Sequence, residues 1–300
     1  MKRRRVAVVG FGKEGRACAD AIHASRDLAL AGIVRGPAGA DQPIPDALRL
    51  IPAVAHVSQV RDVAAALICL PPDVVAATTH DCLQHAVATV DCVQLSGTAL
   101  ESHREVVHRM ALRYNLPAVV GAGWDPGGLS LFRALFALLV PGGHTQVRHH
   151  AGIQLQHTVL PDVRGVRAAL ATERVTLGGK RQRLVYVELE RGADPDRVIK
   201  AIQSDPLHVD VDTQVFPVES LAAIEQEGRG VVLERRGGAT RTGHHQFLLE
   251  ARYEETALTG QVMMAAARAL PKLKPGAHTL LDVPLSALWG DRWVTVEKDL

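Results

Sequence analysis

The chain has 300 residues, of which 47% are hydrophobic and 22% charged, so it can bury the cores of two domains and is not disordered as a whole. The formal net charge is +2, which argues against nucleic acid or an acidic membrane surface as the main partner. No apolar run approaches the roughly 18 to 20 residues that cross a bilayer. The basic start Met1 to Arg5 leads into an expected strand and not into a signal sequence.

The first predicted elements are a strand, a glycine-rich turn and a helix. Residues 5–10, Arg-Val-Ala-Val-Val-Gly, are typical of a central parallel strand, and the small residues of 16–24 predict a helix packed on a sheet. Between them lies Gly10-Phe-Gly-Lys-Glu-Gly15, a G-x-G-x-x-G turn in the setting that a dinucleotide-binding fingerprint requires.

Each glycine of this turn has an expected purpose. Gly10 permits the tight turn, Gly12 lets the backbone approach a pyrophosphate, and Gly15 lets the helix and the strand pack closely. The helix N-terminus attracts the phosphates. Lys13 and Glu14 complete the predicted cofactor-binding segment.

The end of the second predicted strand, Leu28 to Val34, indicates which dinucleotide binds. A site for NAD usually has an acid here, whereas this chain has Arg35 and no acid before Asp41. A guanidinium suits the 2′-phosphate of NADP because it offers planar, charge-assisted hydrogen bonds. The alternative is a surface arginine at the start of a loop, but the missing acid favours NADP.

The rest of the first half alternates between strands and helices, which predicts a right-handed, doubly wound parallel sheet of the Rossmann type. The expected elements are an edge strand near 53–57, strands at 65–70, 89–93 and 117–120, and helices at 73–88 and 100–114. Cys69, Leu70 and Pro71 end one strand where the nicotinamide half of the cofactor should lie. The four cysteines, Cys18, Cys69, Cys82 and Cys92, form no C-x-x-C pair, so we expect inert cytosolic thiols.

The stretch Gly121-Ala-Gly-Trp-Asp-Pro-Gly-Gly128 lies between the strand at 117–120 and an expected apolar helix at 129–139. Asp125 has two interpretations. It can be a helix N-cap with Pro126 at the first helical position, or a carboxylate at the carboxyl end of a strand, where open α/β sheets bind ligands. Spacing alone favours the cap, and one residue can do both.

The second half changes character. Period-two alternation predicts half-buried strands of a mostly antiparallel sheet at 145–151, 184–190, 231–234 and 247–253. Residues 196–204 and 257–270 are expected helices, and the second is long enough to cover a sheet or to re-enter the first domain. Histidines that are neighbours on a strand point to opposite faces, and no H-x-x-x-H pattern lies on an expected helix, so we predict no metal site.

Seven motifs together resemble those of the meso-diaminopimelate dehydrogenase family, over nearly the whole chain. The motifs are Gly10-Phe-Gly-Lys-Glu-Gly-Arg16, Thr89-Val-Asp91, Gly123-Trp-Asp-Pro-Gly127, His157, Val185-Tyr-Val-Glu-Leu-Glu190, Gly230-Val-Val-Leu-Glu-Arg235 and Ala257-Leu-Thr-Gly-Gln-Val-Met263. Gly123-Trp-Asp-Pro-Gly127 is the most specific of them.

The resemblance implies an NADP-dependent amino acid dehydrogenase that acts on a D-configured carbon and works as a cytoplasmic homodimer. In that family, hydride passes from Cα to nicotinamide C4, and the imine left behind is hydrolysed to a 2-oxo acid and ammonia. The reverse reaction is reductive amination. The implied organisation is a dinucleotide-binding domain at 1–122, a substrate-binding and dimerisation domain at 123–256, and a C-terminal return to the first domain at 257–300.

The resemblance also implies site residues. Trp124 and Asp125 match the family's substrate loop. Arg183 matches an arginine that holds a carboxylate, and His157 matches a histidine after a glycine-rich strand end. Glu173 aligns where the family has threonine.

Three departures from the family pattern concern the pocket. Gln94 replaces an aspartate that contacts the reacting amine, Arg229 replaces a histidine, and His244 replaces an asparagine. An amide accepts a hydrogen bond but does not neutralise an ammonium, and arginine adds a permanent charge. These changes favour anionic or less amine-rich ligands and leave Asp125 as the carboxylate near the reacting centre.

Three functions therefore remain open. The first is NADP-dependent oxidation of meso-diaminopimelate or a relative. The second is an imine reductase or a related D-amino acid dehydrogenase. The third is an NADP-binding protein without turnover.

Overall fold

The computed structural model describes residues 3–36, 43–151, 156–157, 163–175, 181–204, 212–221, 229–237 and 245–290. The chain forms two compact units. The first unit comprises Met1–His144, Arg235–His245 and Glu255–Leu300, and the second comprises Thr145–Glu234 and Gln246–Glu254. Within the described residues, no helix is both long and apolar enough to cross a membrane.

The first unit contains a sheet of seven strands in the order β14-β6-β5-β4-β1-β2-β3, and every pair in it is parallel. The strands are β1 (Arg4–Val9), β2 (Leu28–Val34), β3 (Ala53–Val54), β4 (Ala65–Ile68), β5 (Ala88–Asp91), β6 (Pro117–Val119) and β14 (Gly276–His278). The predicted doubly wound parallel sheet is confirmed. The sequence did not predict β14, which comes from the last part of the chain and extends the sheet beyond β6.

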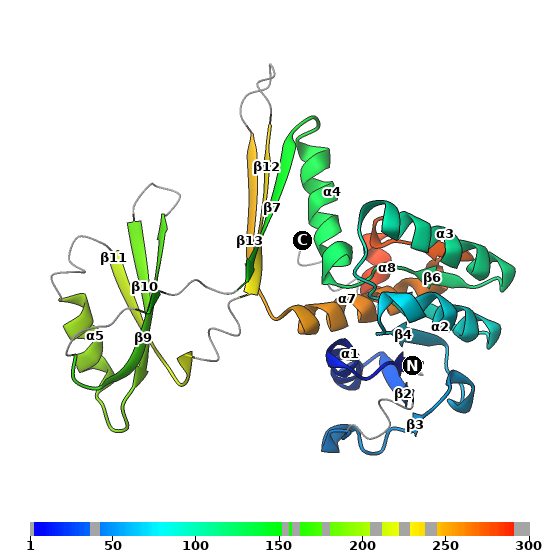
Figure 1. Ribbon diagram of the computed structural model, residues 1–300, viewed down its shortest axis with the longest axis horizontal. Helices are drawn as coiled ribbons and strands as arrows, with labels where there is room; N and C mark the ends of the chain where they lie inside the picture. Colours follow the sequence, from blue (N-terminus) through cyan, green and yellow to red (C-terminus); the bar gives the residue numbers. More distant parts are fainter. Residues whose placement is uncertain are drawn as a thin grey trace. The chain divides into compact units, whose positions relative to one another are not determined.

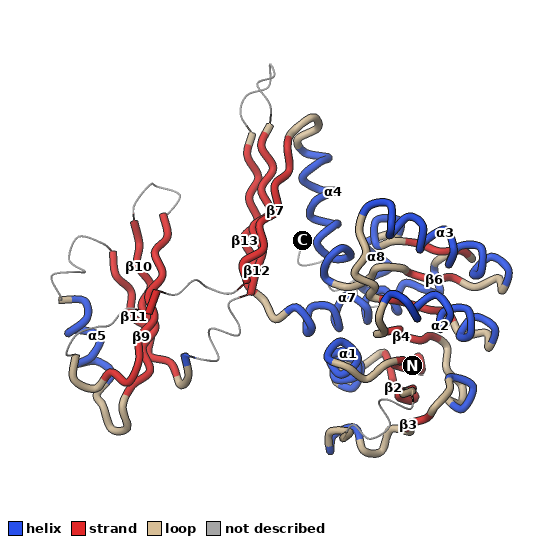
Figure 2. The backbone as a smooth tube through the Cα atoms, in the orientation of Figure 1, coloured by secondary structure: helices blue, strands red, loops and turns tan. Residues whose placement is uncertain are grey.

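Helices lie on both faces of this sheet (Figures 1 and 2). The helices of the first unit are α1 (Lys13–His23), α2 (Pro72–Gln84), α3 (Gly97–Arg113), α4 (Leu129–Leu139), α7 (Glu255–Ala269) and α8 (Leu285–Trp289). Short helical segments are η2 (Asp46–Leu48), η3 (Val57–Gln59), η4 (Trp124–Gly128), η5 (Leu270–Lys272) and η6 (Leu280–Asp282).

The fully apolar central strands divide their side chains between two layers of core. Val6 and Val8 of β1 belong to a cluster with Ile22 of α1 and Met263 of α7. Ala7 and Val9, on the opposite face, belong to a second cluster that includes Val75 of α2. Burial on both faces explains why β1 reads as a continuous apolar run and not as an alternating one.

Helix α7 packs directly on α1 within the first unit. A Cβ atom at Gly260 would lie 2.8 Å from the carbonyl oxygen of Ala17, which shows how closely the two helices approach. Arg268, in the last turn of α7, binds Asp27 just before β2 through both carboxylate oxygens. These contacts join segments that are more than two hundred residues apart in the sequence.

The second unit contains a sheet in the order β11-β10-β9-β8. Its strands are β8 (Gln156–His157), β9 (Val166–Val175), β10 (Arg181–Leu189) and β11 (Asp212–Val218). Strand β9 is antiparallel to both β8 and β10, whereas β11 is parallel to β10. Helix α5 (Pro195–Gln203) packs Val198 and Ile202 against Val185 and Val187 of β10. The sheet is thus mostly antiparallel, as predicted, but β9 and β11 were not expected.

A separate three-stranded sheet has the order β13-β12-β7. Its strands are β7 (His144–Ala151), β12 (Arg229–Arg236) and β13 (Gln246–Arg252). The sequence predicted all three strands but placed them in one sheet with residues 184–190. Alternation reveals that a strand has one buried face, yet it carries no information about which strand is the neighbour.

Candidate functional site

The loops at one edge of the parallel sheet carry most of the predicted cofactor-binding and catalytic residues. Because the seven strands run in the same direction, the loops after β1, β2, β4, β5 and β6 all open at the carboxyl edge, where α/β sheets bind ligands. The predicted residues on these loops and at the start of α1 are Gly10, Gly12, Lys13, Glu14, Gly15, Arg35, Cys69, Leu70, Pro71, Gln94, Trp124 and Asp125.

The glycine turn after β1 has the geometry that its sequence indicates. Gly10 has a φ of +88°, and a Cβ atom there would overlap the carbonyl oxygen of Cys69. A Cβ atom at Gly15 would overlap the carbonyl oxygen of Gly10, so α1 can approach the turn only with glycine. At Gly12 a Cβ atom would meet nothing within 4 Å. The turn is therefore closely packed on its inner side and open in front of the α1 N-terminus, where an anion would bind.

Arg35 lies directly beside this turn. The backbone N–H of Gly10 donates to the carbonyl of Val34 at 2.9 Å, and the N–H of Arg35 donates to Val54 of β3 at 2.9 Å. Arg35 is partly exposed. Its backbone is thus fixed between the glycine turn and the edge strand. Arg35 follows β2 directly, and in this kind of fold the residue that binds the 2′-phosphate of NADP lies near that position.

The segment Cys69-Leu70-Pro71 forms the next part of the edge. The N–H of Cys69 donates to Val9 at 2.8 Å, and its thiol lies 3.7 Å from the sulfur of Cys18 and 3.9 Å from that of Met263. Hydrogen bonds with Cys18 and Cys92, together with burial, raise the pKa of the Cys69 thiol well above its usual value. The thiol is therefore protonated near neutral pH and is part of the wall, not a nucleophile.

A buried pair that the sequence did not reveal fixes the next two loops. One carboxylate oxygen of Asp91, at the end of β5, accepts from the N–H groups of Val93 at 3.1 Å and Gly121 at 2.9 Å. The other oxygen lies 3.0 Å from Nε2 of His103 on α3. Asp91 and His103 are 2% and 7% exposed, so this contact is shielded from water. Through its bonds to Val93 and Gly121, the Asp91 carboxylate holds the loop that carries Gln94 against the loop that carries Trp124 and Asp125.

The motif after β6 is a tight turn whose glycines are sterically required. A Cβ atom at Gly127 would lie 2.6 Å from the carbonyl of Gly121, and one at Gly128 would lie 2.9 Å from the indole of Trp124. The backbone N–H of Trp124 donates to the hydroxyl of Thr259 on α7 at 3.1 Å. Trp124 is therefore held between its own turn and α7, a contact that no local sequence signal predicted.

Asp125 does not cap α4, so the interpretation that spacing favoured is wrong. Helix α4 begins at Leu129 and is preceded by Gly128, whereas Asp125 has extended angles, φ −121° and ψ 123°, before a cis bond to Pro126. Its carboxylate oxygens lie 3.0 and 3.4 Å from the guanidinium of Arg133. Asp125 lies within η4, whose last three residues separate it from the start of α4. Its carboxylate therefore reaches an arginine on the helix instead of the first amides.

The Asp125 carboxylate can be reached from solvent beside this ion pair. Its side chain is 27% exposed and that of Arg133 is 31% exposed. Gln94, on the neighbouring loop after β5, is exposed. The carboxyl edge thus offers an acid and an amide on adjacent loops.

The predicted substrate-binding residues belong to other parts of the chain. Arg183 of β10 pairs in register with Glu173 of β9 and Thr213 of β11, so two of the predicted residues are cross-strand neighbours. His157 pairs with Leu170 on β8 and β9. Arg229 is the first residue of β12. His157, Glu173 and Arg229 are placed by their backbones, and His244 lies outside the described residues.

Comparisons with known proteins agree with the motifs. No protein-family model matches the chain. A meso-diaminopimelate D-dehydrogenase of Bacteroides fragilis is 34% identical over 298 residues, which cover 98% of this chain and 99% of the relative. A C. glutamicum DAP dehydrogenase in complex with DAP aligns with a TM-score of 0.63 and 22% identity, over 100% of both chains. An engineered D-amino acid dehydrogenase bound to NADP+ aligns with a TM-score of 0.63 and 20% identity, also over 100% of both chains.

The solved structures confirm the fold, and the identity with the Bacteroides protein extends from one end of the chain to the other. The resemblance inferred from the sequence motifs is confirmed: this chain belongs to the meso-diaminopimelate D-dehydrogenase family.

Proposed function

We propose that this protein is an NADP-dependent dehydrogenase that oxidatively deaminates a D-configured amino acid centre, in meso-diaminopimelate or a close relative. The products are a 2-oxo acid and ammonia, and the reverse reaction is reductive amination. The observation that carries the proposal is the 34% identity over 98% of the chain with a relative of that name. The carboxyl edge of the first unit, with its glycine turn and Asp125, supports it.

The first unit supplies the cofactor site in this proposal. Gly10, Gly12 and Gly15 present the α1 N-terminus, with Lys13 and Glu14, to the pyrophosphate. Arg35 binds the 2′-phosphate, and Cys69, Leu70 and Pro71 lie along the nicotinamide half. When bound, NADP+ supplies the hydride acceptor at nicotinamide C4.

Asp125 is the proposed carboxylate at the reacting centre. The substrate ammonium first loses a proton to solvent, the neutral nitrogen then becomes an iminium as hydride leaves Cα, and water must then add to the iminium carbon. A carboxylate can hold the ammonium beforehand and accept the proton that the attacking water loses. Arg133 fixes the direction of the carboxylate through two hydrogen bonds. Trp124 forms the wall beside it, and Gln94 accepts a hydrogen bond from the amine without neutralising it.

The second half of the chain supplies the proposed substrate contacts. We assign Arg183 to a substrate carboxylate because arginine binds carboxylates through two parallel hydrogen bonds. Glu173, its cross-strand partner, is the next residue that we propose to bind the substrate. The others are His157, Arg229 and His244. Three of these residues, Glu173, Arg229 and His244, differ from the family pattern, so the distal part of the substrate is where this protein should differ from its relatives.

Family membership also supports proposals about organisation. We propose a dinucleotide-binding domain at 1–122, a substrate-binding and dimerisation domain at 123–256, and a return segment at 257–300. We further propose a homodimer that acts in the cytoplasm, in lysine biosynthesis. Light scattering with size-exclusion chromatography tests the dimer: a monomer at micromolar concentration would contradict it.

A substrate panel tests the reaction. Purified protein is incubated with NADP+ or NAD+ and meso-diaminopimelate or single D-amino acids, and reduced cofactor is measured by absorbance. We expect turnover with NADP+ and meso-diaminopimelate, and much less with NAD+. Asp125→Asn should lower kcat by roughly 10²- to 10⁴-fold, the usual contribution of a positioned acid or base. Asp20→Asn, an exposed carboxylate on α1, is the matched control and should keep full activity.

The replaced pocket residues favour one alternative, a dehydrogenase or imine reductase for a different D-configured substrate. Gln94 carries no charge where the family has an acid, so a substrate with a less basic nitrogen would fit better. A higher kcat/KM for another member of the panel than for meso-diaminopimelate would select this alternative. NADP binding without any turnover would instead select a binding protein.

A further inference from the structure

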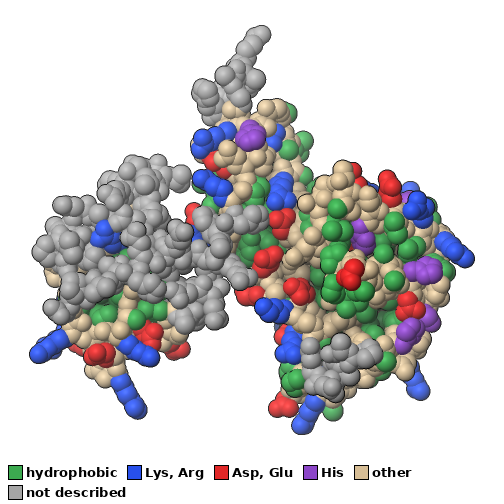
Figure 3. Space-filling model, viewed as in Figure 1, with side chains coloured by type: hydrophobic (Ala, Val, Ile, Leu, Met, Phe, Trp, Pro, Cys, Tyr) green, Lys and Arg blue, Asp and Glu red, His purple; other side chains and the backbone are tan. Residues whose placement is uncertain are grey.

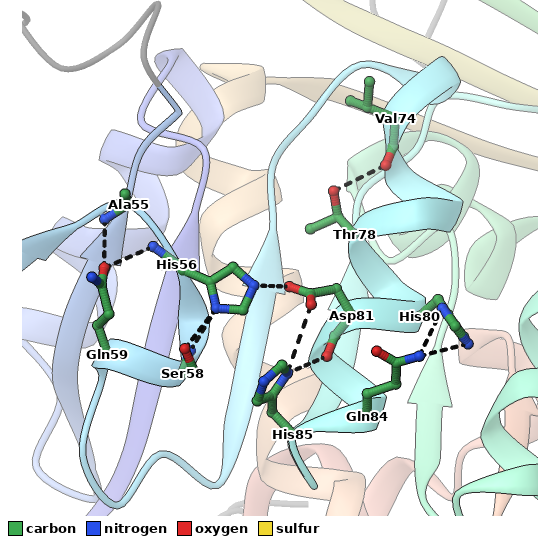
Figure 4. Close-up of polar contacts among 10 residues, drawn as sticks. All are labelled: Ala55, His56, Ser58, Gln59, Val74, Thr78, His80, Asp81, Gln84 and His85. Carbon is green, nitrogen blue, oxygen red and sulfur yellow. Dashed lines mark hydrogen bonds and ion pairs between the residues drawn. The ribbon is translucent and has the colours of Figure 1, made fainter.

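A cluster of His56, Asp81 and His85 lies in the first unit and has no part in the proposed reaction. Nε2 of His56 is 2.8 Å from Oδ2 of Asp81, and Nδ1 of His85 is 3.7 Å from Oδ1 of the same carboxylate. One ligand atom from each residue lies within 4.8 Å of the others. Figure 4 shows both imidazole rings directed at the Asp81 carboxylate. We propose that this cluster is a binding site for a divalent transition-metal ion of the Zn²⁺ or Co²⁺ type.

Two elements that are separate in the sequence form the cluster. Asp81 and His85 are one helical turn apart at the end of α2, so both face the same side of the helix. His56 precedes η3 and comes from the segment that joins β3 to β4. Asp81 is in the last turn of α2, whereas the first turn of that helix follows the carboxyl edge of β4. The cluster is therefore at the other end of α2 from the proposed cofactor site.

The His56 ring is held in place before any ion binds. Its Nδ1 accepts from the N–H of Ser58 at 3.2 Å and lies 2.7 Å from the Ser58 hydroxyl. The Gln59 amide oxygen accepts from the N–H groups of Ala55 and His56, both at 3.0 Å, and closes the capping box. This arrangement leaves the His56 Nε2 directed at Asp81. Ordering of a ligand before binding lowers the entropy that binding must overcome.

The His85 ring donates a hydrogen bond before any ion binds. Its Nδ1, the nitrogen that faces the Asp81 carboxylate, lies 2.9 Å from the backbone carbonyl of Asp81. A carbonyl only accepts, so Nδ1 carries the proton in the metal-free protein. An ion bound to Nδ1 would replace this proton, and the ring proton would then lie on Nε2. At His56, an ion on Nε2 moves the remaining ring proton to Nδ1, where the Ser58 hydroxyl accepts it. The exposed Ser58 N–H then bonds to water.

The donor set indicates the class of ion. Two imidazoles and one carboxylate suit Zn²⁺, Co²⁺, Ni²⁺ or Cu²⁺, whereas Mg²⁺ and Ca²⁺ prefer oxygen ligands alone. Ligands at about 2.0 to 2.1 Å around a tetrahedral ion lie about 3.3 Å apart, so the His56 and Asp81 atoms need to separate only slightly. All three side chains are between 37% and 43% exposed, which leaves the fourth position to water.

The bound ion would fasten the segment after β3 to α2. That segment contains only the short helix η3. Its buried residues Val57 and Val60 belong to the core cluster that includes Val9 of β1. The same edge of the sheet holds Arg35 through the bond from its N–H to Val54. Because the metal would bind the folded chain and not the unfolded one, it should raise the Tm of the protein.

Titration with Co²⁺ tests the proposal. Untagged, chelator-treated full-length protein is titrated while the visible absorption of Co²⁺ is recorded, since a tetrahedral ion absorbs far more strongly than the hydrated one. Two variants remove one ligand each: His56→Asn, whose amide oxygen can still accept from the Ser58 N–H, and His85→Asn. His80→Asn is the matched control on α2, because His80 contacts Gln84 and Tyr114 and lies outside the cluster.

We expect wild type and His80→Asn to bind one Co²⁺ per chain at this site, and Mg²⁺ not to compete. Each ligand variant should bind at least about tenfold more weakly, because even the loss of an outer-shell partner costs 10- to 100-fold. Equal Co²⁺ affinity and spectrum in wild type and in the two ligand variants would overturn the proposal.

A second measurement needs no variant. Carbethoxylation of wild-type histidines by diethyl pyrocarbonate, mapped by mass spectrometry, should be slowed by Zn²⁺ at His56 and His85 and unchanged at His80. Unchanged modification at all three would overturn the proposal even if a variant failed to fold.

Discussion

The ion pair between Arg268 and Asp27 allows a quantitative test of how α7 is fastened to the first unit. Arg268 Nε lies 2.7 Å from Oδ2 of Asp27, and Nη2 lies 3.0 Å from Oδ1. The arginine side chain is 8% exposed and the aspartate 30%. The hydrogen bond from Arg268 is the main cause that lowers the pKa of Asp27 from 3.8 to about 2. The pair therefore stabilises the folded state only while Asp27 is ionised.

Arg268→Met keeps most of the buried stem and removes both hydrogen bonds. A pKa shift of this size corresponds to at most about 2.4 kcal/mol, and contact of Asp27 with water reduces the expected loss to about 1 to 2 kcal/mol. For a domain of this size, each kcal/mol lowers Tm by about 2 to 4 °C. The pKa of Asp27 is lower in the folded than in the unfolded chain, so the contribution is complete above about pH 4 and disappears as the pH falls toward about 2.

Urea denaturation followed by far-ultraviolet circular dichroism, between about pH 7 and about pH 3, measures this contribution. The difference in unfolding free energy between wild type and Arg268→Met should shrink below about pH 4. In an Asp27→Asn background, the same substitution should cost little and show no dependence on pH. A wild-type difference that is absent near neutral pH, or that stays constant throughout, would refute the reasoning.

Four further outcomes follow from the packing of the first unit. Gly15→Ala forces the glycine turn apart and should weaken NADPH binding at least about tenfold in a fluorescence titration, which is about 1.4 kcal/mol. The methyl group of Gly12→Ala has space within the protein, so Tm should be unchanged, and a lower Tm would contradict the open geometry. The same methyl group would keep the pyrophosphate from the backbone, so NADPH binding should weaken. His103→Leu leaves the buried Asp91 carboxylate without its partner and should cost about 3 kcal/mol in urea denaturation. Burial raises the pKa of Cys82 to about 12, so a thiol reagent near pH 8 should label it only after denaturation.

The sequence predicted the elements that local patterns determine. The bounds of α4, Leu129–Leu139, and of β2, Leu28–Val34, agree with the prediction, because both are mostly apolar segments with clear ends. The glycine turn was predictable because the G-x-G-x-x-G pattern is local: Gly10 and Gly15 have steric reasons, and Gly12 leaves open space in front of the α1 N-terminus. On the visible face of the first unit, acidic and basic side chains are interspersed, in keeping with the small net charge (Figure 3).

What the sequence could not predict depends on contacts between distant residues. Strand β14 has only three residues, and it is a strand because β6 is beside it. Strand β9 contains several alanines, which local propensity does not assign to strands. Asp125 looked like a cap because Pro126 follows it, and only the folded turn shows that the carboxylate reaches Arg133.

The candidate sites show the same division. The proposed cofactor edge follows from one motif and the order of the strands, and both can be predicted from the sequence. The cluster of His56, Asp81 and His85 was missed because its first member is far from the other two in the chain. The spacing of Asp81 and His85 on one helix was visible in the sequence, but two ligands do not define a metal site.

The central claim is that hydride leaves the D-configured carbon and reaches NADP+. The most direct measurement uses meso-diaminopimelate carrying deuterium at that carbon, with mass spectrometry of the reduced cofactor. The account predicts that each NADPH formed carries one deuterium, and that substrate labelled only at the L-configured carbon gives unlabelled NADPH. Deuterium retained in the 2-oxo product, label transferred from the L-configured carbon, or no NADPH at all would contradict it.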